Sequence, residues 1–94
     1  MSQTSVSICI PRITKFTTRR KIESTFKKFN LGSIDSIDIL GKENKQRAFI
    51  HFSDWNEESS SAMNVLNRLN KNEVVNVIYS FPWHWRCVKS KFCN

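Results

Sequence analysis

The sequence is poor in the residues that mark linkers, repeats and secreted scaffolds. Its 94 residues include two glycines, two prolines and three cysteines, and they contain no flexible linker, tandem repeat or low-complexity segment. Cys9, Cys87 and Cys93 are odd in number and form no CxxC pair, which argues against a disulfide-rich secreted fold and favours an intracellular location. No apolar run approaches the roughly 18 residues of a membrane span, and no secretion signal is visible. We therefore expect one intracellular domain over residues 1–94.

The composition is that of a globular chain with an excess of positive charge. Hydrophobic residues make up 39% and charged residues 24% of the sequence, which is enough apolar material for a small core. Fifteen Lys and Arg against eight Asp and Glu give a net charge of +7. Such an excess attracts polyanions, so nucleic acid or an acidic protein surface is the expected partner.

Hydrophobic periodicity predicts four strands and two helices. The strands are expected at residues 5–10, 34–40, 47–52 and 74–79. The first helix is expected to begin at Thr17 or Thr18 and to end near Gly32, with Ile22, Phe26 and Phe29 on its apolar side. The second is expected to follow a capping box of Asp54 and Glu57, with Ala62, Leu66 and Leu69 on its apolar side.

The resulting βαββαβ order predicts an α+β, ferredoxin-like split βαβ sandwich. In this fold two helices cover one face of a four-stranded antiparallel sheet, and the other face stays open. We expect a core over residues 5–80 and an aromatic C-terminal extension over residues 81–94. The first and third strands should be the central pair and should bury Ile8, Ile10, Ala48, Ile50 and Phe52. Many functions share this fold, so the fold alone decides none.

Two segments resemble the signature motifs of the RNA-recognition motif (RRM) family. Residues 45–52, KQRAFIHF, match its octapeptide in kind at Lys45, Ala48, Phe49, Ile50 and Phe52. Residues 8–13, ICIPRI, align in register with its hexapeptide on the first strand. The chain therefore resembles an RRM over residues 5–80. The resemblance implies an RRM-like fold and binding of single-stranded RNA on the open sheet face.

A second resemblance covers more of the chain. Its segments are IxIPR at 8–12, LGxI at 31–34, AFIHFxxW at 48–55 and YxxPWxW at 79–85. They are similar to a divergent RRM-like group of short proteins encoded by large double-stranded DNA viruses. This resemblance implies the same fold, a viral origin and a place in the infected cell or the virion. It implies no established activity.

The sequence departs from the RRM pattern where bases would stack. The three positions that hold exposed aromatic residues in the family hold Cys9, Arg47 and Phe49 here. Each stacked base contributes about 1–3 kcal/mol, so two missing aromatics weaken single-strand binding. A planar Arg47 guanidinium replaces part of that contribution, because it stacks on bases and pairs with phosphate.

Two further groups have a structural and a functional interpretation. Arg19, Arg20 and Lys21 fall in the first turn of the first helix, where cations oppose the helix dipole; they form either a solvated surface or a second basic site for an anion. Trp83 and Trp85 either complete the core and sheet edge or fold over the open sheet as an aromatic platform. Trp55 is expected to anchor the core near the start of the second helix.

Catalytic and metal-binding patterns are weak. His84, Cys87 and Cys93 lack the paired spacing of a zinc site, and the first loop lacks the glycine-rich cradle of an acylphosphatase. The sequence shows no Ser/His/acid arrangement or carboxylate pair. We expect no metal, no cofactor and no enzymatic activity.

Together these patterns predict a non-enzymatic module that binds nucleic acid, preferably single-stranded RNA. The expected binding residues on the sheet are Arg47, Phe49, His51 and Cys9, with Lys45, Arg12 and Lys15 contacting phosphate. The alternative is a protein-interaction or virion-structural module without RNA binding and without a membrane partner. Cys9 and an exposed Leu40 favour this alternative, because they suit an apolar contact.

Overall fold

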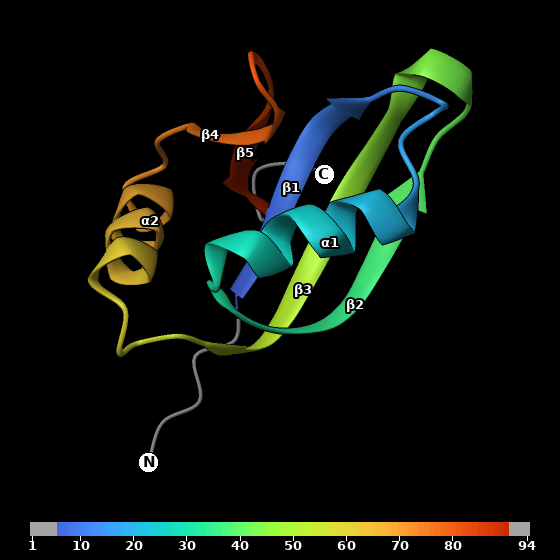
Figure 1. The fold of residues 1–94 in the computed structure, drawn as a ribbon. Coiled ribbons are helices and arrows are strands. Elements are labelled where there is room, and N and C mark those ends of the chain that lie inside the picture. Colours follow the sequence, from blue (N-terminus) through green and yellow to red (C-terminus); the bar gives the residue numbers. More distant parts are fainter. Residues whose placement is uncertain (1–5, 91–94) are drawn as a thin grey trace.

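The computed structural model describes residues 6–90, which form an α+β fold with two α-helices and one five-stranded antiparallel sheet (Figure 1). The strand order is β2-β3-β1-β5-β4. The elements are β1 (Val6–Ile13), α1 (Arg19–Phe29), β2 (Gly32–Leu40), the short 3-10 helix η1 (Glu43–Lys45), β3 (Gln46–Trp55), α2 (Ser60–Asn70), β4 (Val75–Ser80) and β5 (Trp83–Lys89).

The expectation of a four-stranded sheet is wrong. β5 lies beside β1, with Cys9 paired to Val88, and β4 pairs with β5 at the outer edge. Part of the expected C-terminal extension is therefore a strand of the sheet, and it contributes Trp85 and Cys87 to the core. The reason is that Pro82 lies in the turn of a β4–β5 hairpin, after a cis peptide bond, whereas the sequence interpretation placed the end of the sheet there.

The pairing of the first and third strands is confirmed. Ile8 lies opposite Ile50, and Ile10 lies opposite Ala48. These four residues and Phe52 are all at most 2% exposed, as the period-2 pattern predicted. The residues between them, which include Cys9 and Phe49, point to the other face of the sheet.

Helix α1 begins as predicted but ends differently. The Thr18 hydroxyl oxygen accepts a hydrogen bond from the Lys21 backbone N–H at 3.1 Å, which is N-cap geometry. The left-handed residue at the carboxyl end is Asn30, with φ 52°, and not Gly32. Gly32 instead begins β2 with φ +154°, where a Cβ would lie 2.1 Å from the Asp54 carbonyl oxygen. Phe29, expected in the core, is 44% exposed.

Helix α2 begins later than the proposed capping box. Asp54 belongs to β3, which continues to Trp55, and the helix N-cap is Ser59, whose hydroxyl accepts from the Ala62 N–H at 3.2 Å. The expected apolar side of the helix is buried. The Trp55 side chain is 3% exposed, and its Nε1 donates to the Ala62 carbonyl at 2.9 Å, which confirms its role as an anchor.

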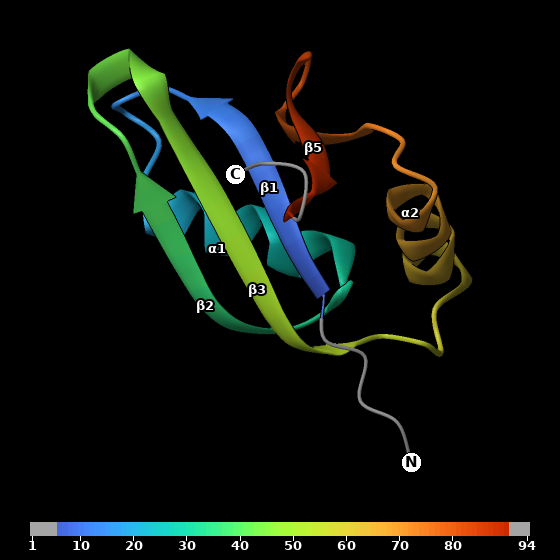
Figure 2. The same ribbon diagram turned by 180° about the vertical axis from the view of Figure 1, so that it is seen from behind.

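One hydrophobic core joins both helices to the sheet. Phe26 of α1 stacks on Trp85 with ring centroids 6.3 Å apart, and Trp85 stacks on Tyr79 at 4.5 Å. In Figure 1, α1 crosses β1, β3 and β2, whereas α2 lies beside β4 and β5. Figure 2 shows the opposite face, where no helix covers β1, β2 or β3. Neither helix has the length and apolarity that a membrane span requires.

Candidate nucleic-acid interface

The face without helices carries the predicted side chains of β3. Arg47, Phe49 and His51 alternate along the strand with buried core residues, so all three belong to this face. Arg47 is exposed, whereas Phe49 and His51 are half-buried. The strand thus presents a cation, an aromatic ring and an imidazole in a row.

Cys9 is not accessible on this face. It lies opposite Phe49 in the β1–β3 pairing, but it is 0% exposed and takes part in a disulfide bond. A base cannot reach it, so its inclusion among the binding residues is corrected. Disulfides persist mainly in oxidising compartments, so the cysteine pattern gives no support for an intracellular location.

His51 is held by hydrogen bonds on both sides, an arrangement that the sequence analysis did not predict. Its Nδ1 lies 2.7 Å from the Ser7 hydroxyl in β1, and its Nε2 lies 3.1 Å from the Asp38 carboxylate in β2. Because a carboxylate only accepts, Nε2 carries a proton and donates it to Asp38. The expectation that no Ser/His/acid arrangement exists was therefore wrong.

These two hydrogen bonds hold the imidazole between Ser7 of β1 and Asp38 of β2. Acyl transfer would also require N–H donors aimed at a developing oxyanion. The line of Ser7, His51 and Asp38 consists of side-chain groups only, so by itself it does not supply these donors. We interpret the hydrogen bonds of Ser7 and Asp38 as contacts that orient the His51 ring.

Basic side chains gather at one end of the sheet. The pairs Ile13–Gln46 and Leu40–Arg47 show that the carboxyl end of β1 and the β2–β3 turn lie at the same end, which both ribbon views also show (Figures 1 and 2). The exposed cations there are Arg12, Lys42, Lys45 and Arg47, with Glu43 as the acid of the turn. The predicted phosphate contacts Arg12 and Lys45 therefore adjoin the Arg47 end of β3.

Lys15 lies in the loop between β1 and α1. Its Nζ is 5.3 Å from the ring centroid of Phe16, a cation–π distance. Both residues are exposed. The side chain therefore remains open to a phosphate.

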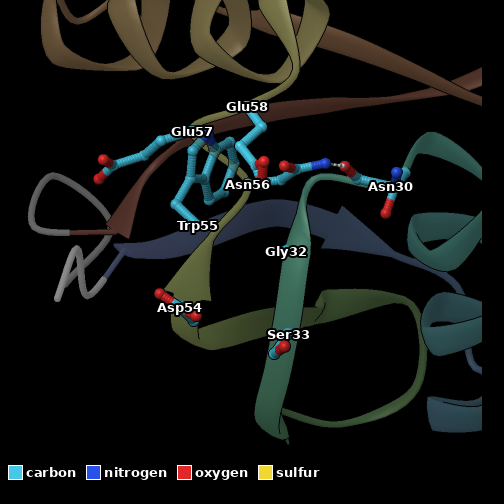
Figure 3. Close-up of a pocket in the computed structure, with 8 residues that line it drawn as sticks. All are labelled: Asn30, Gly32, Ser33, Asp54, Trp55, Asn56, Glu57 and Glu58. Atoms are coloured by element: carbon cyan, nitrogen blue, oxygen red, sulfur yellow. Dashed lines mark hydrogen bonds between the residues drawn. The ribbon is translucent and has the colours of Figure 1, made fainter.

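The opposite end of the sheet is acidic. Asp54, Glu57 and Glu58 line a cavity of about 500 Å³ beside the start of β2 (Figure 3). The Asn56 side-chain N–H donates to the Asn30 carbonyl at 3.0 Å and closes one side of it. These three acids weaken the attraction of a polyanion to this end of the sheet relative to the Arg12 end.

The second basic site on α1 is engaged within the fold. Arg19 Nε donates to the Ile37 carbonyl at 2.9 Å, and Lys21 Nζ lies 5.0 Å from the Tyr79 ring centroid. The groove next to Arg19 and Arg20 also contains Glu23 and Asp35. These acids and contacts favour the structural interpretation, and an anion site at this helix end stays a prediction.

The two tryptophans of β5 have different environments. Trp85 is 5% exposed in the core, so it cannot act as an aromatic platform and that part of the expectation is corrected. Trp83 is 65% exposed, and the preceding Phe81 is 85% exposed. The tip of the β4–β5 hairpin therefore presents two aromatic rings to solvent.

Two basic residues near β1 were missed as binding residues. His84 and Arg86 of β5 line a groove of about 470 Å³ together with Arg12. The groove walls are Pro11, Val74, Trp85 and Val88. Alternation with the buried Trp85 and Cys87 was the signal that could have placed His84 and Arg86 on the open face.

Cys87 belongs to the core and not to a metal site. Its thiol is free and 1% exposed, and desolvation by burial raises its pKa from 9.0 to about 12. Within residues 6–90 no cluster of three or more His, Cys, Asp or Glu side chains has the arrangement of a metal site.

Comparison with known proteins finds no matching family model, no similar curated protein and no similar solved structure. The resemblance to RRMs therefore depends on the two motif segments in β1 and β3.

Proposed function

We propose that this chain is a non-enzymatic module that binds single-stranded nucleic acid, preferably RNA, on the open face of its sheet. The observation that carries the proposal is the row of Arg47, Phe49 and His51 on β3, on a face that no helix covers. In this role Phe49 stacks on a base, and Arg47 stacks or pairs with a phosphate.

The distribution of charge supports the same surface. The net charge is +7, and exposed cations surround the β3 end that begins at Arg47. Arg12, Lys15 and Lys45 are the proposed phosphate contacts. The Asp38 carboxylate on this face is hydrogen-bonded to His51, which reduces its repulsion of a phosphate.

We also propose that the fold is ferredoxin-like and related to the RRM. The four strands β2-β3-β1-β5 would then form the sheet of the split βαβ sandwich, with β5 in the place of the family's fourth strand and β4 as an added edge strand. The agreement of both motif segments with the central strands supports this assignment.

The proposal is tested by fluorescence anisotropy with the whole chain. Single-stranded RNA, single-stranded DNA and duplex DNA of equal length are titrated at two salt concentrations. We expect the tightest binding for single-stranded RNA and weaker binding at higher salt, because phosphate contacts release counterions. Equal affinity for the duplex would contradict a stacking site, and absence of binding at low salt would contradict the proposal.

A protein-interaction module is the second candidate, and one observation favours it. Leu40 is 55% exposed and lies beside Arg47 in the strand pairing, while Cys9 is lost as a contact. An exposed leucine contributes more to an apolar protein contact than to nucleic-acid binding. If no nucleic acid binds at low salt, this candidate replaces the first.

A further inference from the structure

We infer that the groove between the end of β1 and the β4–β5 hairpin is a nucleotide subsite, in which Arg12, His84 and Arg86 hold a phosphate of a bound single strand. This inference deepens the proposed function and depends on it. It extends the interface from the centre of the sheet to β5.

The chemistry of the groove matches a nucleotide. Among the residues that the structure describes, its polar lining is basic, since Arg12, His84 and Arg86 line it and no Asp or Glu does. Pro11, Val74 and Val88 provide apolar walls, against which a base or ribose can pack. Its volume of about 470 Å³ lies within the usual range for small-molecule sites.

The groove continues the proposed binding face. Cys9 pairs with Phe49 on one side and with Val88 on the other, so Val88 and Phe49 are on strands that flank β1. Arg86 lies two residues before Val88 and shares its face. Phe49 and the groove therefore lie on the same face of the sheet, on opposite sides of β1.

The probe is an oligouridylate of about 12 nucleotides, within the site sizes of small single-strand-binding modules.

The groove itself is tested by Arg12→Gln with Arg86→Gln, and the matched control is Lys28→Gln in the last turn of α1, on the helix side. All three residues are exposed, and circular dichroism verifies that the variants fold. At ~0.1 M salt each lost phosphate contact lowers single-strand affinity roughly 5-fold. We expect the double variant to bind the oligouridylate roughly 20-fold more weakly and Lys28→Gln to remain within about 2-fold.

The outcomes separate this inference from the proposed function. If the native chain binds and the double variant stays within about 2-fold, the groove inference is wrong and binding at the sheet centre stands. If the double variant weakens binding but Phe49→Ala does not, the groove is supported and the sheet-centre site is wrong. If the native chain binds no single strand, both are overturned.

Discussion

Arg19 and Arg20 are neighbouring cations in the first turn of α1, and the structure gives them different roles. Arg19 Nε donates to the Ile37 carbonyl of β2 at 2.9 Å in a part-buried position, so it joins the helix to the sheet. Arg20 is exposed. We predict that Arg19→Gln leaves the domain less stable than Arg20→Gln does.

The size of the difference follows from what the two substitutions share. Each removes one positive charge from the amino end of the helix, which is favourable by about 0.3–1 kcal/mol, and each removes a cation from the groove that also contains Glu23 and Asp35. These contributions largely cancel in the comparison. A hydrogen bond from a charged donor contributes about 1.5–3 kcal/mol, and partial exposure favours the lower value. A difference of about 1.5 kcal/mol corresponds to about 6–12 °C in Tm for a domain of this size.

Thermal unfolding followed by circular dichroism measures the difference directly, and urea denaturation gives the free energy. Arg20→Gln should unfold at or slightly above the native Tm, and Arg19→Gln should unfold below it. Equal Tm values for the two variants would refute the claim that the Arg19–Ile37 hydrogen bond stabilises the fold.

Two further predictions concern Gly32 at the start of β2 and Cys87 in the core. Gly32→Ala should destabilise the domain by at least about 2 kcal/mol. The backbone of residue 32 has φ +154°, and the added Cβ would lie 2.1 Å from the Asp54 carbonyl oxygen. A urea midpoint equal to that of the native chain would contradict this. Cys87 should resist alkylation in the native chain at about pH 8 and react in urea, because only the thiolate is a nucleophile and burial raises its pKa to about 12. Because burial raises the pKa of the Cys87 thiol in the folded state from 9.0 to about 12, the free energy of unfolding keeps its full contribution from the neutral thiol below pH 9.0 and loses it toward pH 12. Cys87→Ala has no thiol to ionise, so its free energy of unfolding should fall less over that range. Equal alkylation rates with and without urea would contradict the assigned burial.

Local patterns predicted the central strands and the first helix well. The alternation of residues 47–52 assigns Phe49 and Phe52 to opposite faces, because each strand residue points opposite to its neighbour. The α1 N-cap at Thr18 was likewise predictable, since a hydroxyl before an amphipathic run has one favourable use.

The predictions that were wrong concern features that depend on contacts between distant segments. Pro82 is compatible with both the end of a sheet and a hairpin turn, and only the packing of Trp85 on Phe26 selects the turn. The line of Ser7, His51 and Asp38 depends on the register of three strands, which no local pattern encodes. The disulfide at Cys9 was hidden for the same reason.

The most direct test of nucleic-acid binding on the open sheet face is the affinity of Phe49→Ala for single-stranded RNA. The matched control is Phe29→Ala, which removes an equal ring at the end of α1, on the helix side, where the ring is 44% exposed. We predict that Phe49→Ala binds about 1–3 kcal/mol more weakly than the native chain and that Phe29→Ala binds as the native chain does. Native affinity in a folded Phe49→Ala variant would contradict the claim that the open sheet face binds nucleic acid.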